Sequence, residues 1–596
     1  MSISLRSMTR DHRPPSVTKK HLCIAACTLL LVSITYADHV PDWAKDIVWY
    51  QVFPERFANG DSSNDPTRES LSDPQKVPYS WSVMNWDADW QQRAIWEERL
   101  SPYFHDTLQH RRYGGDLQGV IDKLDTLKAL GVNGIYFNPV FYADSLHKYD
   151  GNSFHHIDPH FGPDPEGDLA LILTESSSPR SWQWTAADKL FLHLLQEAKR
   201  RGMRIIIDGV WNHTGRDFFA FSDIRSKHQK SRYARWYDVT HFDDPRTAHN
   251  EFNYHGWSGF KSLPEFANDP SGQTLAPGPK HYIFHASKRW MDPNGDGDPS
   301  DGIDGWRLDV AEEVPNGFWE EWHAYIRSIN PEVFTSAEIW GSSADFLKQT
   351  HFSSAMNYRG FAIPIKGWLI DGKISVSEFS RRLDTERNSH TPDTKFTLQN
   401  LIDSHDTQRV ASAIANRHSF TEYKNADWFD YDDGERVNTR TRGYNNASPD
   451  ETGRRIWKMV ALFQATYVGS PMIYYGTENG MWGADDPEDR KPTNWNQIDT
   501  EIHQSYQQAL ALRHRFVSLR RGAYRVLETR DDSQIFAFER THRDERVVIV
   551  FNRGNGDAYL NVDYLKGLEL IYATDVKATT KHLPQHSGAA FAKPIY

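Results

Sequence analysis

Cysteine is almost absent from this chain of 596 residues, which contains two. Both of them, Cys23 and Cys27, lie within the first 37 residues. Those residues have the features of a removable leader, described below, so we expect the mature protein to contain no cysteine. This excludes disulfide bonds, a cysteine nucleophile and metal sites built from thiolates.

Basic residues are scarce relative to acidic ones. The chain has 68 lysines and arginines against 80 aspartates and glutamates, and its formal net charge is −12. A broad basic surface is the usual electrostatic requirement for binding nucleic acid, and this composition does not favour one. After residue 37, no apolar run is long enough to span a membrane. We therefore expect neither a nucleic-acid partner nor a membrane partner for the mature protein.

The N-terminus is typical of an export signal. Five basic residues precede an apolar run over residues 22–34, and Ala37 offers a small residue for cleavage. The run is short for a membrane-spanning helix, and an uncleaved anchor is the alternative. We predict a signal peptide at residues 1–37 and an exported protein, either periplasmic or extracellular.

Short apolar runs typical of buried strands recur along the chain, with amphipathic stretches typical of helices between them. The runs occupy residues 47–53, 134–137, 204–207, 305–308, 333–336, 396–398 and 471–475. Helical periodicity is clear at residues 117–130 and 187–201. Strands that alternate with helices over this length favour a parallel sheet, and eight repeats close a barrel. We therefore predict an α/β fold, a (β/α)8 TIM barrel.

Two departures from this alternation indicate further domains. Residues 214–301 are rich in Gly, Pro, Asp and aromatic residues and are too long for a simple loop, so we predict an inserted subdomain after the third strand. From about residue 520 the pattern changes to alternating strands. The predicted domains are a catalytic barrel at residues 38–519, which includes the insertion, and a C-terminal β-sandwich at residues 520–596.

Polar residues follow four of the predicted strands, at the end of a barrel where catalytic residues are found. They are Asp208, Asn212 and His213 after the third strand, Arg307 and Asp309 at the fourth, Glu338 at the fifth, and His405 and Asp406 at the seventh. A lone carboxylate is more readily explained by a salt bridge or a helix cap. Three carboxylates that meet at one end of the barrel suit the cleavage of a glycoside. That reaction needs an ionised carboxylate at the anomeric carbon and a protonated carboxyl at the leaving oxygen. A pair about 5 Å apart would retain the configuration.

Four stretches of the chain resemble the α-amylase family of glycoside hydrolases (glycoside hydrolase family 13). They are residues 208–213, 305–309, 337–340 and 404–406, and the resemblance extends over residues 45–595. The resemblance implies Asp309 as the nucleophile, Glu338 as the general acid/base, and Asp406 as the carboxylate that binds the hydroxyls of the distorted sugar. It also implies further substrate-binding residues in the same site. These are Tyr149, Asp150, His213, Arg307 and His405.

Within the family, the chain is most similar to cyclomaltodextrinases, neopullulanases and maltogenic amylases. Residues 147–150, 157–162 and 310–314 carry this similarity. Glu313 matches the acceptor-side glutamate of that group, whereas Glu312 stands where the group usually has Asn. Trp340, next to the acid/base, is expected to form a wall of a sugar subsite. The group usually has an extra N-terminal β domain, and here the barrel begins soon after the predicted leader, so the oligomeric state stays open.

The predicted function is hydrolysis of α-1,4 glucosidic bonds, with retention of configuration, in starch-type glucans, maltooligosaccharides, pullulan or cyclodextrins. The sequence leaves open whether α-1,6 bonds are cleaved as well. A transglycosylase or an α-glucosidase on the same scaffold is an alternative, because a site that holds a sugar and excludes water favours transfer. A non-catalytic glucan-binding protein is a third interpretation. It predicts the loss of at least one carboxylate, and Asp309, Glu338 and Asp406 are all present.

The loop at residues 59–65 concentrates oxygen donors, namely Asn59, Asp61, Asn64 and Asp65. Hard cations such as Ca²⁺ take six to eight oxygen ligands, so the loop suits calcium, and an Asx-rich turn without a metal is the alternative. The loop resembles the calcium site of neopullulanase-like enzymes, in which a Gly and an Asp like Gly114 and Asp116 complete the shell. We predict a structural Ca²⁺ ion at these six residues.

A second acidic loop, at residues 292–298, begins like a helix–loop–helix calcium loop. Gly297 occupies the sixth position, but Ile303 stands at the twelfth, where a glutamate normally binds the ion. A solvated acidic loop and a second metal site are both consistent with this pattern.

Overall fold

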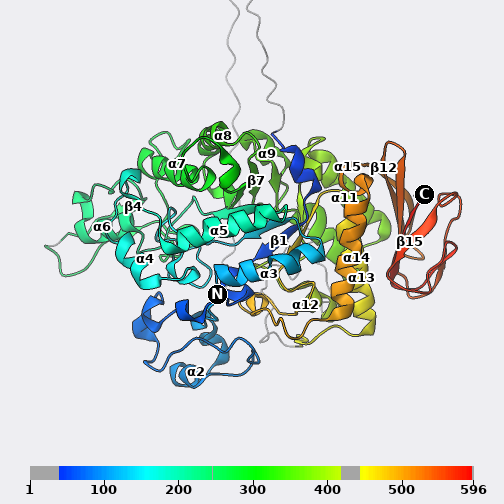
Figure 1. Ribbon diagram of the computed structural model, residues 1–596, viewed down its shortest axis with the longest axis horizontal. Coiled ribbons are helices and arrows are strands. Elements are labelled where there is room, and N and C mark those ends of the chain that lie inside the picture. The colour runs from blue at the N-terminus through cyan, green and yellow to red at the C-terminus, as the bar shows by residue number, and fades with distance from the viewer. Residues whose placement is uncertain (1–38, 245, 418–442, 594–596) are drawn as a thin grey trace, which may run out of the picture. The chain divides into compact units, whose positions relative to one another are not determined.

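The computed structural model describes residues 39–244, 246–417 and 443–593, and Figure 1 shows the arrangement of their helices and strands. The predicted signal peptide at residues 1–37 lies outside the described residues. Among the helices in these three ranges, none is both long enough and apolar enough to cross a membrane.

Eight parallel strands form the barrel, as predicted. They are β1 (Trp49–Val52), β2 (Gly134–Phe137), β3 (Arg204–Gly209), β6 (Gly305–Leu308), β7 (Phe334–Ala337), β8 (Ser354–Ala355), β9 (Gln399–Asn400) and β10 (Ser470–Tyr474). They pair in the order β8-β7-β6-β3-β2-β1-β10-β9. The two ends of this order meet through a parallel bridge between Met356 and Gln399, which closes the barrel. All side chains of β1, β2, β6 and β7 are buried, because helices cover the outside and side chains fill the inside.

Long helices surround the barrel. They are α3 (Leu117–Leu130), α5 (Ala186–Arg200), α7 (Pro277–Met291), α8 (Asn316–Ile329), α11 (Val376–Ser389), α13 (Glu451–Thr466) and α14 (Thr500–Arg515). The α5 helix shows why they form. Thr185 caps its first turn reciprocally with Asp188, and its buried residues recur at helical spacing to face the sheet.

The connection from β1 to α3 is a long segment with a hydrophobic core of its own. It contains α1 (Pro54–Phe57), five short 3-10 helices and α2 (Ile95–Leu100), and it is the part labelled α2 in Figure 1. Its core residues are Leu71, Val77, Trp81, Met84, Trp90, Trp96, Leu108 and Tyr113. Inside it, Arg111 forms a fully buried ion pair with Glu97 at 2.8 Å. The sequence did not predict this segment.

The predicted insertion at residues 214–301 contains α6 (Phe219–Lys227), the two-stranded sheet of β4 (Val239–His241) and β5 (Asn253–Tyr254), and α7. Of these, α7 packs against α8, as a helix of the barrel does. The boundaries of this subdomain stay a prediction.

The C-terminal part is all-β, as predicted, and follows α15 (Val517–Arg521). A five-stranded antiparallel sheet has the order β11-β12-β13-β17-β15, and a two-stranded sheet pairs β14 with β16. Their bounds are β11 (Ala523–Arg530), β12 (Ile535–His542), β13 (Glu545–Asn552), β14 (Ala558–Tyr559), β15 (Glu569–Ala573), β16 (His582–Leu583) and β17 (Ser587–Ala592). Alternate residues of β12 face opposite sides. Ile535 lies in the core of the β domain, whereas Phe536 contacts Phe463 of α13.

Candidate active site

A cavity of about 690 Å³ opens at the carboxyl ends of the barrel strands. Most of its lining follows β2, β3, β6, β7, β9 and β10, so residues distant in sequence share one space. Of the predicted site residues, it brings together Tyr149, His213, Asp309, Glu338, Trp340, His405 and Asp406.

Arg307 of β6 lies beneath this cavity and contacts three carboxylates. Its Nη1 donates to Asp309 Oδ1 at 3.1 Å and to both carboxylate oxygens of Asp208 at 3.0 Å. Its Nη2 lies 3.0 Å from Glu338 Oε2 in an ion pair. The two predicted catalytic carboxylates, from β6 and β7, therefore contact the two ends of one guanidinium.

Glu338 directly follows β7 and is held by one ion pair and two hydrogen bonds. Besides Arg307, the backbone N–H of Val310 donates to its Oε2 at 2.9 Å, and Trp340 Nε1 donates to its Oε1 at 3.2 Å. The Trp340 ring stacks on Tyr358 with the centroids 4.4 Å apart, which fixes its plane at the cavity wall. The carboxyl group of Glu338 therefore has a defined orientation.

His405 and Asp406 face the same cavity from the loop after β9. His405 Nε2 lies 2.6 Å from Tyr149 Oη and 3.0 Å from Asp406 Oδ2, and its Nδ1 lies 2.9 Å from Gln51 Nε2. Arg490, from the loop after β10, donates to Asp406 Oδ1 at 3.2 Å. These contacts form a polar wall that suits the hydroxyl groups of a sugar.

Burial and mutual repulsion shift the pKa values of these acids upward. Burial, followed by the charge of Glu338, raises the pKa of Asp309 well above its usual value, and Arg307 opposes the shift. Burial raises the pKa of Asp406 to about 7 against the opposing charge of Arg490. Closely spaced carboxyls in such a site do not all ionise at neutral pH. Cleavage with retention requires an ionised nucleophile and a protonated acid. Burial alone favours the protonated form of Asp309, and the ion pair with Arg307 at 3.1 Å is the contact that favours its ionised form.

The remaining predicted substrate-binding residues differ in their positions. His213 lines the cavity and stacks on Trp257 with the ring centroids 5.7 Å apart; burial lowers its pKa to about 3, so it is neutral. Asp150 is held by the hydroxyl of Ser145, and Glu313 ends a 3-10 helix. Neither Asp150 nor Glu313 is among the residues that line the cavity. Their roles stay a prediction.

A family comparison agrees with this geometry. The model of the α-amylase catalytic domain matches residues 51–174 and 185–429. The chain belongs to the α-amylase family. It is 34% identical over 523 residues to neopullulanase 2 from Thermoactinomyces vulgaris, covering 87% of this chain and 72% of that relative. It is 31% identical over 518 residues to the intracellular maltogenic amylase of Bacillus subtilis (strain 168), covering 86% of this chain and 70% of that relative.

A solved structure of a related hydrolase has the same fold. The cyclic α-maltosyl-(1→6)-maltose hydrolase from Arthrobacter globiformis aligns with a TM-score of 0.69 and 27% identity, over 93% of this chain and 100% of that chain. The predicted family, the similarity to neopullulanases and maltogenic amylases, and the barrel fold are therefore confirmed. The protein is a glycoside hydrolase of the α-amylase family.

Several lining residues of this α-amylase-family enzyme were missed in the sequence. Trp257, Phe260 and Leu263 come from the segment between β5 and α7, and His105 and Gln109 come from the connection between β1 and α3. The loop after β10 supplies Asp485, Asp486, Pro487 and Arg490. The charged cluster after the last predicted strand was a usable signal. The aromatic residues sit in irregular segments, where no periodicity marks them.

The predicted calcium loop lies beside the start of α3. Gly60 N and Asp61 N donate to Asp116 at 3.0 and 2.8 Å, and Asn59 Nδ2 lies 2.7 Å from Asp65 Oδ1. The positive φ of Gly114 and its closeness to Asp65 exclude a side chain there, because a Cβ would lie 1.9 Å from Asp65 Oδ1. The structure thus groups five predicted ligands. The Asp61 carboxylate instead accepts hydrogen bonds from Ser63 in its own turn.

Two features of this loop fit a bound cation. Asn64 Oδ1 is buried with no hydrogen-bond partner. Burial, together with the nearby charges of Asp116, Glu55 and Asp61, raises the pKa of Asp65 to about 6. An oxygen-rich site whose negative charges repel one another is the environment that a hard cation stabilises.

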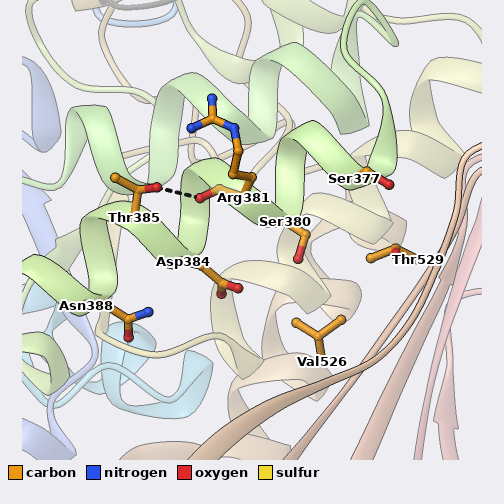
Figure 2. A pocket seen from close by; sticks show the side chains of 8 residues that line it. All are labelled: Ser377, Ser380, Arg381, Asp384, Thr385, Asn388, Val526 and Thr529. Atoms are coloured by element: carbon orange, nitrogen blue, oxygen red, sulfur yellow. Dashed lines mark hydrogen bonds between the residues drawn. The ribbon is translucent and has the colours of Figure 1, made fainter.

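A second hollow, of about 490 Å³, lies between α11 and β11 (Figure 2). Asp384 is the one carboxylate in its lining, and it pairs with Arg387 at 2.6 Å. Without a second carboxylate, this hollow cannot carry out the chemistry of a glycosidase, so the barrel mouth is the candidate active site.

Proposed function

We propose that this enzyme hydrolyses α-1,4 glucosidic bonds with retention of configuration, in starch-type glucans, maltooligosaccharides, pullulan or cyclodextrins. The observation that carries the proposal is the pairing of Asp309 and Glu338 on one guanidinium at the floor of one cavity. The names of the relatives support α-glucans as the substrate class.

In the first step, the Asp309 carboxylate attacks the anomeric carbon while protonated Glu338 donates its proton to the leaving oxygen. The glycosidic C–O bond breaks, and a glycosyl ester forms on Asp309. In the second step, ionised Glu338 takes a proton from water, the water oxygen attacks the anomeric carbon, and the ester bond breaks. Arg307 contacts both carboxylates, so it stabilises whichever of them is ionised at each stage.

Asp406, His405 and Tyr149 are proposed to bind the sugar on the donor side. Tyr149 and His405 lie nearly parallel, with the ring centroids 5.5 Å apart. Asp406 accepts a hydrogen bond from Arg490, and its carboxylate side chain is 26% exposed, so it can still contact hydroxyl groups. On the leaving-group side, Trp340 is 37% exposed beside Glu338 and offers a flat apolar surface.

Transfer to a sugar acceptor is a second candidate activity. Trp257 and Phe260 add two more aromatic rings to the lining, with the centroids 6.2 Å apart. A sugar that stacks on such surfaces would compete with water for the glycosyl ester. Cleavage of α-1,6 bonds belongs to the same proposal, because the name of the aligned hydrolase from Arthrobacter globiformis includes such a bond.

We further propose that Asn59, Asn64, Asp65, Gly114 and Asp116 hold a structural Ca²⁺ ion, with Asp61 as the sixth predicted ligand. The buried, unpartnered Asn64 Oδ1 and the absence of a side chain at Gly114 support the site. The ion would neutralise the carboxylates of this loop and join it to the N-terminus of α3.

Export to the periplasm or the medium is also a proposal. It rests on the basic and apolar residues of the first 37 positions. Expression of the full chain, followed by N-terminal sequencing of the protein recovered outside the cytoplasm, tests it. A mature N-terminus at residue 38 is expected, and an uncleaved chain in the membrane fraction would contradict it.

The product profile on starch, pullulan and a cyclodextrin tests the proposed activity. We expect turnover of at least one, and a loss of about 10²–10⁴-fold in kcat/KM for Glu338→Gln, which keeps the side-chain shape but not the titratable proton. Glu320→Gln, at an exposed glutamate of α8 outside the cavity lining, is the matched control and should retain activity. With maltotriose, products longer than the substrate indicate transfer. No turnover of any substrate by the folded protein would refute the proposal.

A further inference from the structure

Two adjacent histidines meet a glutamate away from the active site. His155 and His156 precede α4 (Pro165–Ile172), and Glu175 follows it. His155 Nε2 lies 3.1 Å and His156 Nε2 2.8 Å from the same atom, Glu175 Oε2. The three side chains are 4%, 0% and 3% exposed. Within the described ranges, no other group of three His, Cys, Asp or Glu ligand atoms converges within 4.8 Å.

The far nitrogen of each histidine has its own partner. His156 Nδ1 lies 2.8 Å from Asp188 Oδ2, and His155 Nδ1 lies 2.7 Å from Tyr282 Oη. Such contacts fix the orientation of an imidazole and leave Nε2 as the coordinating atom, as they do around metal-binding histidines. Both rings are therefore held with Nε2 directed at Glu175.

The surroundings restrict how Glu175 could bind an ion. Its Oε1 accepts a hydrogen bond from Gln183 N at 2.6 Å, so Oε2 is the oxygen directed at the histidines. The Trp182 ring stacks on His155, with the centroids 4.1 Å apart and the planes at 16°, and covers one side of the group. None of the three side chains lines the active-site cavity or belongs to the calcium loop.

We propose that His155, His156 and Glu175 bind a divalent metal ion of the zinc class. Two imidazole nitrogens and one carboxylate oxygen are a ligand set that suits Zn²⁺, whereas Ca²⁺ takes oxygen ligands. Ligands of a tetrahedral zinc ion lie about 3.4 Å apart. The two spacings between the histidine nitrogens and Glu175 Oε2, 3.1 and 2.8 Å, therefore need to open by less than about 1 Å. Three protein ligands leave the fourth position for a water molecule.

The ion would join two segments that pack on the active-site barrel. The histidines lie in the connection after β2, which also carries Tyr149, and Glu175 lies in the connection between α4 and α5. Because an ion that binds only the folded state stabilises it, zinc should raise the melting temperature of the metal-free protein. Hydrolysis of glucans is not required for this role, so the proposal stands apart from the proposed function.

Measurement of bound metal tests the proposal. The protein is produced in cells supplied with zinc, purified, and dialysed against a buffer that contains calcium but no zinc. Elemental analysis should find close to one zinc per chain. His155→Gln retains an N–H donor toward Glu175 but replaces the imidazole nitrogen by an amide, whose oxygen is a much weaker ligand for zinc, and Glu175→Gln lacks the charge. Both should lose the zinc. His193→Gln, at a half-exposed histidine of α5, is the matched control and should keep it.

Cobalt provides a readout that does not depend on the variants. Co²⁺ added to the metal-free parent should give the intense visible absorption of a tetrahedral site, and Zn²⁺ should displace it. The melting temperature should rise by several degrees with Zn²⁺ but not with additional Ca²⁺. A parent protein without bound zinc, with no cobalt spectrum and with an unchanged melting temperature would overturn the proposal and leave these residues as a hydrogen-bonded network only.

Discussion

The backbone of Val310 contributes directly to the position of the acid/base. Val310 has a φ of 39°, in the left-handed region that β-branched residues rarely adopt. This conformation costs about 1–3 kcal/mol and persists only where the surroundings enforce it. Here it follows the proposed nucleophile and directs the N–H of Val310 to Glu338 Oε2 at 2.9 Å. The strained residue therefore links the two carboxylates on which the proposed chemistry depends.

At the residue scale, Asp406→Asn should stabilise the protein above neutral pH. Burial raises the pKa of Asp406 to about 7, above its value of 3.8 in the unfolded chain. The folded state then holds this proton more tightly, so the parent loses stability as the pH rises from about 4 to 7. Asparagine cannot ionise, so the variant should escape this loss, and its gain in the free energy of unfolding should be largest at pH 8.

Thermal unfolding of the parent and the variant at pH 4, 6 and 8 measures this difference. The melting temperature of Asp406→Asn should exceed that of the parent at pH 8, and the two should converge at pH 4. Asp122→Asn, at an exposed carboxyl of α3, should show no such trend. A variant that is less stable than the parent at pH 8 would contradict a raised pKa of Asp406 in the folded protein.

The sequence predicted Asp309 and Glu338 because each directly follows a strand. Asp309 and Glu338 come immediately after apolar runs, and parallel strands bring their carboxyl ends to one edge. Trp257 and Arg490 lie in long irregular segments, whose course depends on tertiary packing that no local pattern encodes. For the same reason, the sequence did not indicate that Asp150 and Glu313 lie outside the cavity lining.

At the scale of elements, the connection between β1 and α3 has a hydrophobic core of its own and contributes His105 and Gln109 to the lining of the active site. Half of its core residues are aromatic, and Glu97 forms hydrogen bonds within the segment to Arg111 and Thr107. His105 of this segment lies 3.2 Å from Glu488 of the loop after β10. Two connections far apart in sequence therefore meet at the rim of the cavity.

Glu97→Gln should loosen this segment. The Glu97–Arg111 pair is fully buried, and removal of one partner from a buried pair typically costs about 3–5 kcal/mol because the other charge is left uncompensated. Limited proteolysis of the native protein should then cleave within residues 53–116 faster than in the parent. Glu98→Gln, at the exposed neighbouring residue, is the matched control. Equal cleavage rates in all three proteins would show that the pair does not hold the segment together.

Short strands limited the prediction of the barrel. β8 and β9 have two residues each, too few for any periodic pattern, so β8 was not predicted. The apolar run at residues 396–398 was interpreted as a strand, which is wrong, because Phe396 ends a 3-10 helix and the strand begins at Gln399. The longer strands were found because their burial on both faces requires continuous apolar runs.

At the scale of the whole molecule, removal of calcium tests how far the loop at residues 59–65 supports the fold. A chelator selective for Ca²⁺ should lower the melting temperature by several degrees, and added Ca²⁺ should restore it. Asp65→Asn should abolish this response, since it removes a proposed charged ligand. Asp345→Asn, at an exposed carboxyl of α9 (Ala344–Thr350) outside both acidic loops, should retain it. A melting temperature indifferent to the chelator would contradict the proposed ion.

The proposed mechanism requires that Asp309 forms a covalent bond to the sugar and that Glu338 donates and then accepts the proton. A fluorinated glycosyl fluoride that forms the ester but releases it slowly should trap this intermediate, and mass spectrometry of the digested protein locates the label. The account predicts one glycosyl group per chain on the peptide that contains Asp309, and none in Asp309→Asn. A label on another residue, or an inverted anomer as the first product of an active enzyme, would contradict it.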